Sequence, residues 1–290
     1  MSQKGMNQKV IDPWVNVSMG EVAHLGFMQR VKEDYFKAGD DFFRNIEPAE
    51  MIAMMDQLGV EKVLLSCSAY KASERILSFT KLYPGRFFLA VQPDLKRGMK
   101  GLWALEEMAK EYPVAMARIA PFEIDIAPND PIYYPFYAKC IEMDMPVGIN
   151  TGIAGPPMPS ECQNPMHLDR VCYHFPQLKL IMQHGADPWW EIAIRLMIKY
   201  KNLHLMTSAY APQYLPPSLI HYMNTRGKKK IMFASDHPVL TIERCLTEAK
   251  TLDLKEGVLE HYLYENANRV LFGKREPRYQ KYKIDEYLTG

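Results

Sequence analysis

The sequence predicts a (β/α)₈ barrel, also called a TIM barrel, within the α/β class. Short apolar runs alternate with amphipathic stretches along almost the whole chain, which is typical of repeated strand–helix units and a parallel sheet. Eight such units can be counted, as this barrel requires, and a length of 290 residues fits the fold.

Eight short apolar runs are the predicted strands. They cover residues 9–17, 61–67, 86–92, 113–120, 145–150, 178–184, 202–208 and 230–236. An open, doubly wound sheet is the alternative architecture. It fits less well, because the eight regular units occur without a glycine-rich phosphate-binding loop.

Amphipathic stretches between these runs are the predicted helices. The first, 48–59, has Pro48 near its first turn and Gly59 at its end, an asymmetry that helices favour. The second, 73–83, stops just before a Pro-Gly pair that breaks helices. The next five cover 101–112, 134–144, 166–175, 188–200 and 216–224, and a last helical region consists of 242–252 followed by 258–272.

We expect a single domain over residues 1–290, with 273–290 as a polar and aromatic C-terminal tail. Two connections, 18–47 and the proline-rich 152–165, are too long for tight turns between a strand and a helix. Long loops in a compact fold often form lids or binding loops. These two segments are therefore candidates to cover a site.

Composition and charge limit the partners. A net charge of +1 gives no electrostatic reason to expect nucleic acid or an anionic membrane surface. The five cysteines are scattered and never form a C-x-x-C pair, which argues against disulfides and zinc ribbons and for a reducing compartment. The N-terminal residues lack the apolar segment of a signal peptide, and no apolar run reaches membrane-spanning length. We expect a cytoplasmic protein that binds a small molecule.

The catalytic candidates are polar residues at the C-terminal ends of the strands, since those ends surround the open mouth of a barrel. His184 ends the sixth strand and precedes Gly185, which allows a sharp turn, and imidazole suits acid–base chemistry. A buried structural histidine is the alternative. Asp236 ends the eighth strand and could orient the histidine, take a proton from water or bind a metal. The alternative for Asp236 is a turn or helix cap.

Other strand-end residues are candidates for contact with the substrate. Arg118, at the end of the fourth strand, could hold a carboxylate by a bidentate contact, or it could pair with Glu123 or Asp125. Aromatic residues at the strand ends could line an apolar pocket. The full set of predicted substrate-binding residues is Trp14, Asn16, Arg118, Asn150, Tyr210 and His237.

At these residues the chain resembles the amidohydrolase superfamily. The resemblance is to the amidohydrolase-related branch, which includes aminocarboxymuconate-semialdehyde decarboxylase, aromatic-acid decarboxylases and predicted TIM-barrel hydrolases. Its markers, in chain order, are VID, PVGINTG, LKLIMQHG, FASDHP and the final ENANRVLF. Each marker is weak alone, but their order and spacing over nearly the whole chain are more specific.

The resemblance implies a metal site, and this sequence departs from it. The first strand of the family carries two histidine ligands where this chain has Trp14 and Asn16, and Asn150 replaces a histidine ligand in the fifth strand. His184 matches the family's catalytic histidine, and Asp236 matches its aspartate ligand. Zinc wants about four donors of the nitrogen, sulfur or carboxylate kind. We therefore predict no tightly bound metal, with a divalent ion such as zinc at Asp236 and His184 as the less favoured alternative.

Together these residues favour a hydrolase that acts without a tightly bound metal on a small carboxylated or aromatic ester, lactone or amide. His184 or Asp236 would activate water or move a proton. Arg118, Asn16 and Asn150 would hold an oxygen on which negative charge develops. The alternatives are a carboxy-lyase of an aromatic or unsaturated acid, a hydratase or dehydratase, and a non-catalytic barrel that binds a small ligand. The resemblance also implies a homodimer.

Overall fold

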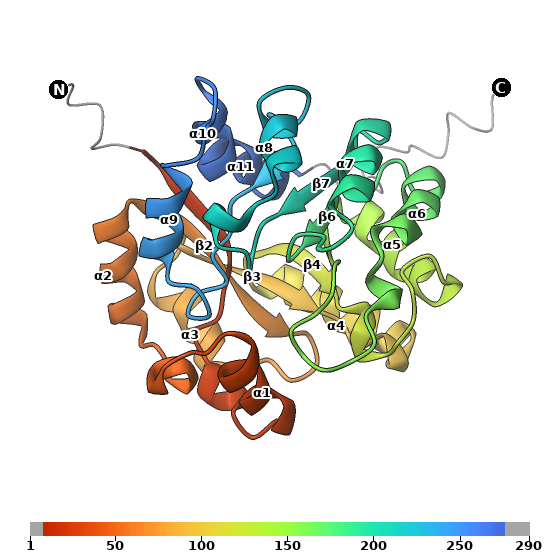
Figure 1. Ribbon diagram of the computed structural model, residues 1–290. Helices are drawn as coiled ribbons and strands as arrows, with labels where there is room; N and C mark the ends of the chain where they lie inside the picture. Colours follow the sequence, from red (N-terminus) through yellow and green to blue (C-terminus); the bar gives the residue numbers. More distant parts are fainter. Residues whose placement is uncertain (1–7, 276–290) are drawn as a thin grey trace.

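The computed structural model describes residues 8–275 and contains a curled sheet of parallel strands surrounded by helices (Figure 1). Its eight strands follow one another in chain order, so the predicted barrel is confirmed and the doubly wound sheet, whose strand order reverses, is excluded. The strands are β1 (Val10–Val15), β2 (Val60–Ser68), β3 (Phe87–Gln92), β4 (Val114–Ile119), β5 (Val147–Asn150), β6 (Leu180–Gln183), β7 (Leu203–Met206) and β8 (Ile231–Met232).

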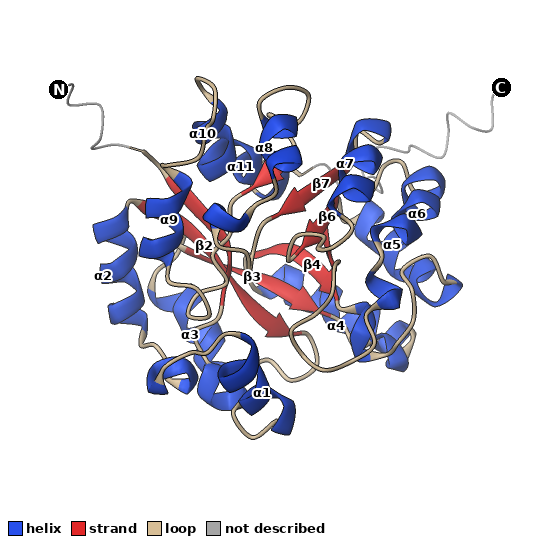
Figure 2. Ribbon diagram, in the orientation of Figure 1, coloured by secondary structure: helices blue, strands red, loops and turns tan. Residues whose placement is uncertain are grey.

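Helices alternate with the strands and cover the outside of the sheet (Figure 2). Each predicted helical region is confirmed, with ends that differ by a few residues, as is usual where helix ends fray. The helices are α1 (Gly26–Arg30), α2 (Pro48–Leu58), α3 (Glu74–Leu82), α4 (Met99–Glu111), α5 (Tyr134–Glu142), α6 (Leu168–His174), α7 (Trp190–Lys199), α8 (Pro217–Met223), α9 (Ile242–Ala249), α10 (Val258–Glu260) and α11 (Asn266–Leu271).

The last strand differs most from its prediction. The run 230–236 was expected as one strand, but only Ile231–Met232 pairs as a ladder with β7. Beyond it the chain turns to β1, where the N–H of Asp236 donates to the carbonyl of Trp14 at 3.1 Å. An isolated parallel bridge joins Val15 to His237. The ends of the first and eighth strands therefore still lie side by side.

The carboxylate of Asp12 fastens this seam between β1 and β8. Asp12 is fully buried and accepts hydrogen bonds from the backbone N–H of Ser235 at 3.0 Å and from its hydroxyl at 2.5 Å. Burial raises the pKa of Asp12 to about 6, although these hydrogen bonds act in the opposite direction. The seam thus depends on one side chain as well as on backbone pairing.

Asp12→Ala is expected to lower the free energy of unfolding by about 3 kcal/mol, because two donors of Ser235 would be left buried without an acceptor. Urea unfolding at neutral pH measures the loss. Ser235→Ala, which removes only the hydroxyl, is the matched control and should cost less. A loss below about 1 kcal/mol in Asp12→Ala would contradict this role.

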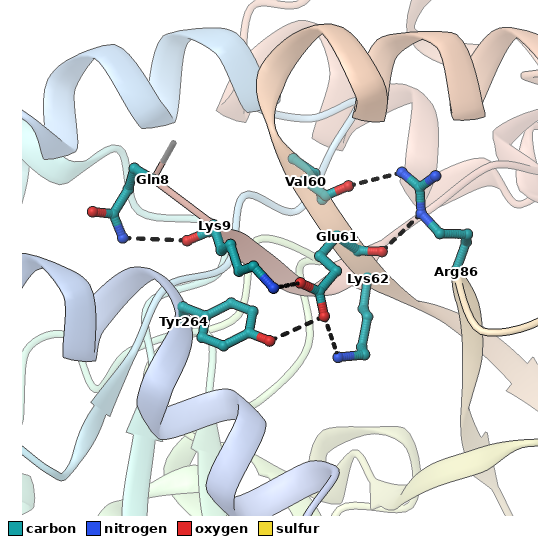
Figure 3. A network of polar contacts seen from close by, with 7 residues as sticks. All are labelled: Gln8, Lys9, Val60, Glu61, Lys62, Arg86 and Tyr264. Carbon is teal, nitrogen blue, oxygen red and sulfur yellow. Dashed lines mark hydrogen bonds and ion pairs between the residues drawn. The ribbon is translucent and has the colours of Figure 1, made fainter. Parts of the chain in front are cut away.

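At the opposite end of the strands, Glu61 of β2 connects Lys9, just before β1, to the helical segment His261–Glu265 (Figure 3). Its carboxylate accepts hydrogen bonds from Lys62 at 2.5 Å, from Lys9 at 2.9 Å and from the hydroxyl of Tyr264 at 3.0 Å. Burial opposes the charge, but these donors prevail and lower the pKa of Glu61 to about 2. In barrels of this kind this end serves stability rather than catalysis.

The two long connections that were predicted as lids or binding loops lie at one end of the barrel. The 18–47 connection contains short helical turns, including α1, and it lies with the 152–165 connection at the C-terminal end of the strands (Figure 1).

Of the predicted tail, residues 276–290 lie outside the described residues, while Arg275 donates to the carbonyls of Val114 and Ala115. All five cysteines are free and buried. No helix within residues 8–275 has the length and apolar character needed to cross a membrane.

Candidate active site

A cavity of about 280 Å³ lies at the C-terminal ends of the strands, beneath the two long connections. Every predicted site residue except His237 lines it. These residues come from or follow six different strands and are far apart in the sequence. They are Trp14, Asn16, Arg118, Asn150, His184, Tyr210 and Asp236.

The upper wall of the cavity is apolar and includes three phenylalanine rings. It was not assigned residue by residue from the sequence, although the 18–47 connection was expected as a lid or binding loop. The apolar side chains that line it include Met19, Val22, Phe27, Met28, Val31, Phe36, Phe122 and Val239. A wall of this kind excludes water and strengthens electrostatic interactions inside.

Asp236 lies at the base of the cavity, almost fully buried. Its backbone has a φ of 67°, an uncommon conformation for a residue other than glycine and one found at strained functional sites. One carboxylate oxygen accepts a hydrogen bond from the side-chain amide of Asn16 at 2.8 Å. Burial raises the pKa of Asp236 to about 7, although hydrogen bonds from Asn16 and Trp14 act in the opposite direction. Asp236 can therefore hold or release a proton near neutral pH.

His184 faces the same cavity, also from a left-handed backbone position with a φ of 62°. Its backbone N–H donates to the hydroxyl of Ser208 at 3.1 Å. Its ring packs in a T-shaped arrangement with the ring of Trp14, with 5.5 Å between the ring centres. Burial, and then the charge of Arg118, lower the pKa of His184 to about 3. The ring is therefore neutral near pH 7.

Arg118 extends from β4 into the cavity and is only 8% exposed. Its Nη1 donates to the side-chain oxygen of Gln92 at 2.9 Å, and its Nη2 donates to that of Asn150 at 3.0 Å. The guanidinium carbon lies 4.6 Å from the centre of the Trp14 ring, which is cation–π distance. Three side chains thus fix the orientation of this cation.

Arg118 forms no salt bridge with a carboxylate of residues 8–275, so the alternative pairing with Glu123 or Asp125 is not found there. Glu123 instead accepts a hydrogen bond from Gln92 at 2.5 Å. Burial lowers the pKa of Arg118, and the charges of Glu123 and Asp236 oppose that shift. A guanidinium nevertheless stays protonated in proteins, so the cavity contains a permanent positive charge.

His237 does not line this cavity, unlike the other predicted substrate-binding residues. Its backbone N–H donates to the hydroxyl of Ser235 at 2.9 Å, and its carbonyl accepts from the N–H of Asn16 at 2.7 Å. Burial lowers the pKa of its ring to about 4, with Arg44 and Glu50 acting on it electrostatically.

Gln92, which accepts a hydrogen bond from Arg118, was not among the predicted site residues. Glu123, which accepts from Gln92, was predicted only as a possible partner of the arginine. Glu123 also lines a larger cavity of about 580 Å³ near the ends of β2 and β3, which contains none of the predicted site residues.

The residues around the 280 Å³ cavity do not fit a divalent metal ion. Within residues 8–275 no group of three or more His, Cys, Asp or Glu side chains is arranged to hold one. His184, Asp236 and Glu123 offer good donors in this cavity, but Glu123 already accepts a hydrogen bond from Gln92. Trp14 offers no donor, and the amide of Asn150 is already bonded to Arg118. The fixed charge of Arg118 also opposes a second cation.

Comparison with solved structures identifies the same architecture elsewhere. An uncharacterised TIM-barrel protein of Bordetella bronchiseptica is 23% identical, with 91% of this chain and 99% of that chain covered at a TM-score of 0.74. 2,6-Dihydroxybenzoate decarboxylase from Rhizobium is 16% identical over 91% and 99%, with a TM-score of 0.67. 5-Carboxyvanillate decarboxylase from Novosphingobium aromaticivorans, complexed with manganese and a nitrobenzoic acid, is 14% identical over 93% and 97%, also at 0.67. At these identities the likeness establishes the fold alone.

Sequence comparison gives the family. None of the curated proteins matches the chain. The family model described as amidohydrolase, in contrast, matches residues 11–273, which is most of the chain and includes every residue that lines the cavity. The resemblance seen in the sequence is thereby confirmed, and the protein belongs to the amidohydrolase family.

Proposed function

We propose that this protein is a decarboxylase of a small aromatic carboxylic acid. The observation that carries the proposal is a buried carboxyl, Asp236, which can hold a proton near neutral pH in the same cavity as a fixed cation, Arg118. Two similar structures are named as decarboxylases of aromatic acids. These names support decarboxylation better than the hydrolase predicted first.

The cavity favours a substrate with one ring. Its volume of about 280 Å³ lies just below the range of roughly 300–1,000 Å³ for ligand pockets. Phe27, Phe36 and Phe122 provide flat apolar surfaces for an aromatic ring, and Arg118 provides a partner for its carboxylate.

In the proposed reaction, Arg118 orients the acid so that the ring carbon bearing the carboxylate lies against Asp236. The proton of Asp236 moves to this carbon. The bond between the carbon and the carboxylate then breaks, its electron pair returns to the ring, and CO₂ leaves. Asp236 remains as a carboxylate and regains a proton from solvent. A hydroxyl group on the ring favours the step, because it donates electron density to the carbon that takes the proton.

His184 and Asn16 are proposed to support this step without transferring the proton themselves. Neutral His184 can form a hydrogen bond with a substrate hydroxyl. Asn16 donates to one oxygen of Asp236 and so holds the carboxyl in position. Of the two groups predicted to move a proton, the carboxyl of Asp236 is thus proposed as the acid and the imidazole of His184 as a neutral partner.

A screen of hydroxybenzoic acids and of matching esters and lactones, carried out in water enriched in oxygen-18, tests this function. Decarboxylation predicts one CO₂ per product and no oxygen-18 in the product. Oxygen-18 in a new carboxylate, without CO₂, would instead support hydrolysis. A barrel that only binds its ligand would return every compound unchanged.

The rate is expected to fall as the pH rises above about 7. Asp236 must be protonated to act as the acid, and its pKa of about 7 means that this form is lost above that pH. His184, with a pKa of about 3, is already neutral and adds no change between about pH 5 and 9. A kcat profile over that interval measures the effect. A rate that rises through pH 7 would indicate that Asp236 acts as a base and would contradict the proposed mechanism.

A further inference from the structure

We propose that the guanidinium of Arg118 takes the electrostatic role of a divalent metal ion, so that the cavity binds an aromatic carboxylate without any metal. The proposal rests on the proposed function only for the choice of ligand. It concerns binding, and it does not require that the bound acid be decarboxylated.

The cation is held in place by neutral groups. Its two terminal nitrogens donate to the amide oxygens of Gln92 and Asn150, and the face of Trp14 lies against it at 4.6 Å. Amide oxygens and an indole orient a guanidinium without cancelling its charge. They leave it as a fixed positive centre, which a metal ion would otherwise provide.

No carboxylate of the described residues pairs directly with this charge. Arg118 is 8% exposed and its Nε has no hydrogen-bond partner there. The nearby carboxylates Glu123 and Asp236 act on it electrostatically, but each is engaged by an amide, Glu123 by Gln92 and Asp236 by Asn16. Burying a charge without a direct partner is costly, so an anion that enters the cavity and pairs with the guanidinium is favoured.

The same contacts oppose a metal ion. The side-chain oxygen of Asn150 is occupied by Arg118, and the amide of Asn16 donates to Asp236. A divalent ion would therefore have to displace these bonds and also approach a fixed positive charge. The permanent cation and the missing donors therefore both argue against a divalent metal ion in this cavity.

Calorimetric titration of 2,6-dihydroxybenzoate into the protein tests the inference. The protein is first treated with EDTA and dialysed, and its metal content is measured. Binding is expected to be unchanged by this treatment and by added Mn²⁺. Arg118→Met should weaken binding by about tenfold or more, the loss expected for a hydrogen-bonded charge pair. Arg195→Met on α7, outside the cavity, is the matched control and should bind as the wild type does.

A neutral probe guards against a variant that is merely misfolded. 2,6-Dihydroxybenzamide carries no charge and should bind equally to the wild type and to Arg118→Met. Equal loss of both ligands in Arg118→Met, or binding that EDTA abolishes and Mn²⁺ restores, overturns the inference. If the acid binds without metal but no CO₂ is released, the proposed function fails while the inference stands.

Discussion

Asp236→Asn is expected to lower kcat for decarboxylation by about 10³-fold, within the range for loss of a general acid. Asparagine has nearly the shape of the carboxyl and can still accept the hydrogen bond that Asn16 donates, so the cavity should remain intact. It cannot supply the proton. The measurement is CO₂ release under saturating substrate.

Asn16→Ala is the matched control for this variant, because it removes the neighbour that holds Asp236 and leaves the acid in place. A loss of only about tenfold is expected. Circular dichroism and ligand binding should show both variants folded. If Asp236→Asn retained a rate within tenfold of the wild type, another group would have to be the acid.

Gly185→Ala is expected to lower the free energy of unfolding by about 3 kcal/mol and to lower activity as well. Gly185 has a φ of 67°, and an added Cβ would lie 2.4 Å from a ring carbon of Trp190 and 3.0 Å from one of Tyr210. Backbone strain contributes about 1–2 kcal/mol and overpacking about 1–3 kcal/mol. The adjacent His184 would be displaced. Urea unfolding and kcat are the two measurements.

Gly85→Ala separates the two causes of this loss. Gly85 has a φ of 80°, but an added Cβ would meet nothing within 4 Å. It should therefore lose only the backbone contribution of about 1–2 kcal/mol and keep full activity. Equal losses in the two variants would mean that close packing around Gly185 has no part in holding the site.

The barrel and the two central groups could be predicted from the sequence because both follow from local patterns. Apolar runs and breakers mark the strands, and the ends of parallel strands meet at one mouth. His184 and Asp236 end such runs, and both line the cavity. The predicted eighth strand was too long, because the residues after Met232 turn to β1 and to Asp12 instead of continuing the ladder with β7.

The electrostatics of the site could not be predicted in the same way. The pKa values of His184 and Asp236 depend on burial, which loops far away in the sequence provide. The amides that accept from Arg118 come from neighbouring strands. Gln92 could be recognised as one of these partners only from the structure, which places β3 beside β4. His237 was predicted to bind substrate because it follows Asp236, but the chain leaves the strand after Met232 and takes a left-handed turn at Asp236, so adjacency in sequence did not place His237 at the cavity.

A single turnover in heavy water tests most directly the transfer of a proton from Asp236 to the substrate. The protein is equilibrated in D₂O, mixed with the accepted hydroxybenzoic acid and quenched, and the product is examined by mass spectrometry and NMR. One deuterium at the carbon that lost its carboxylate, with one CO₂ per product, is the expected result. A product that retains its carboxylate, or CO₂ released at an equal rate by Asp236→Asn, would contradict it.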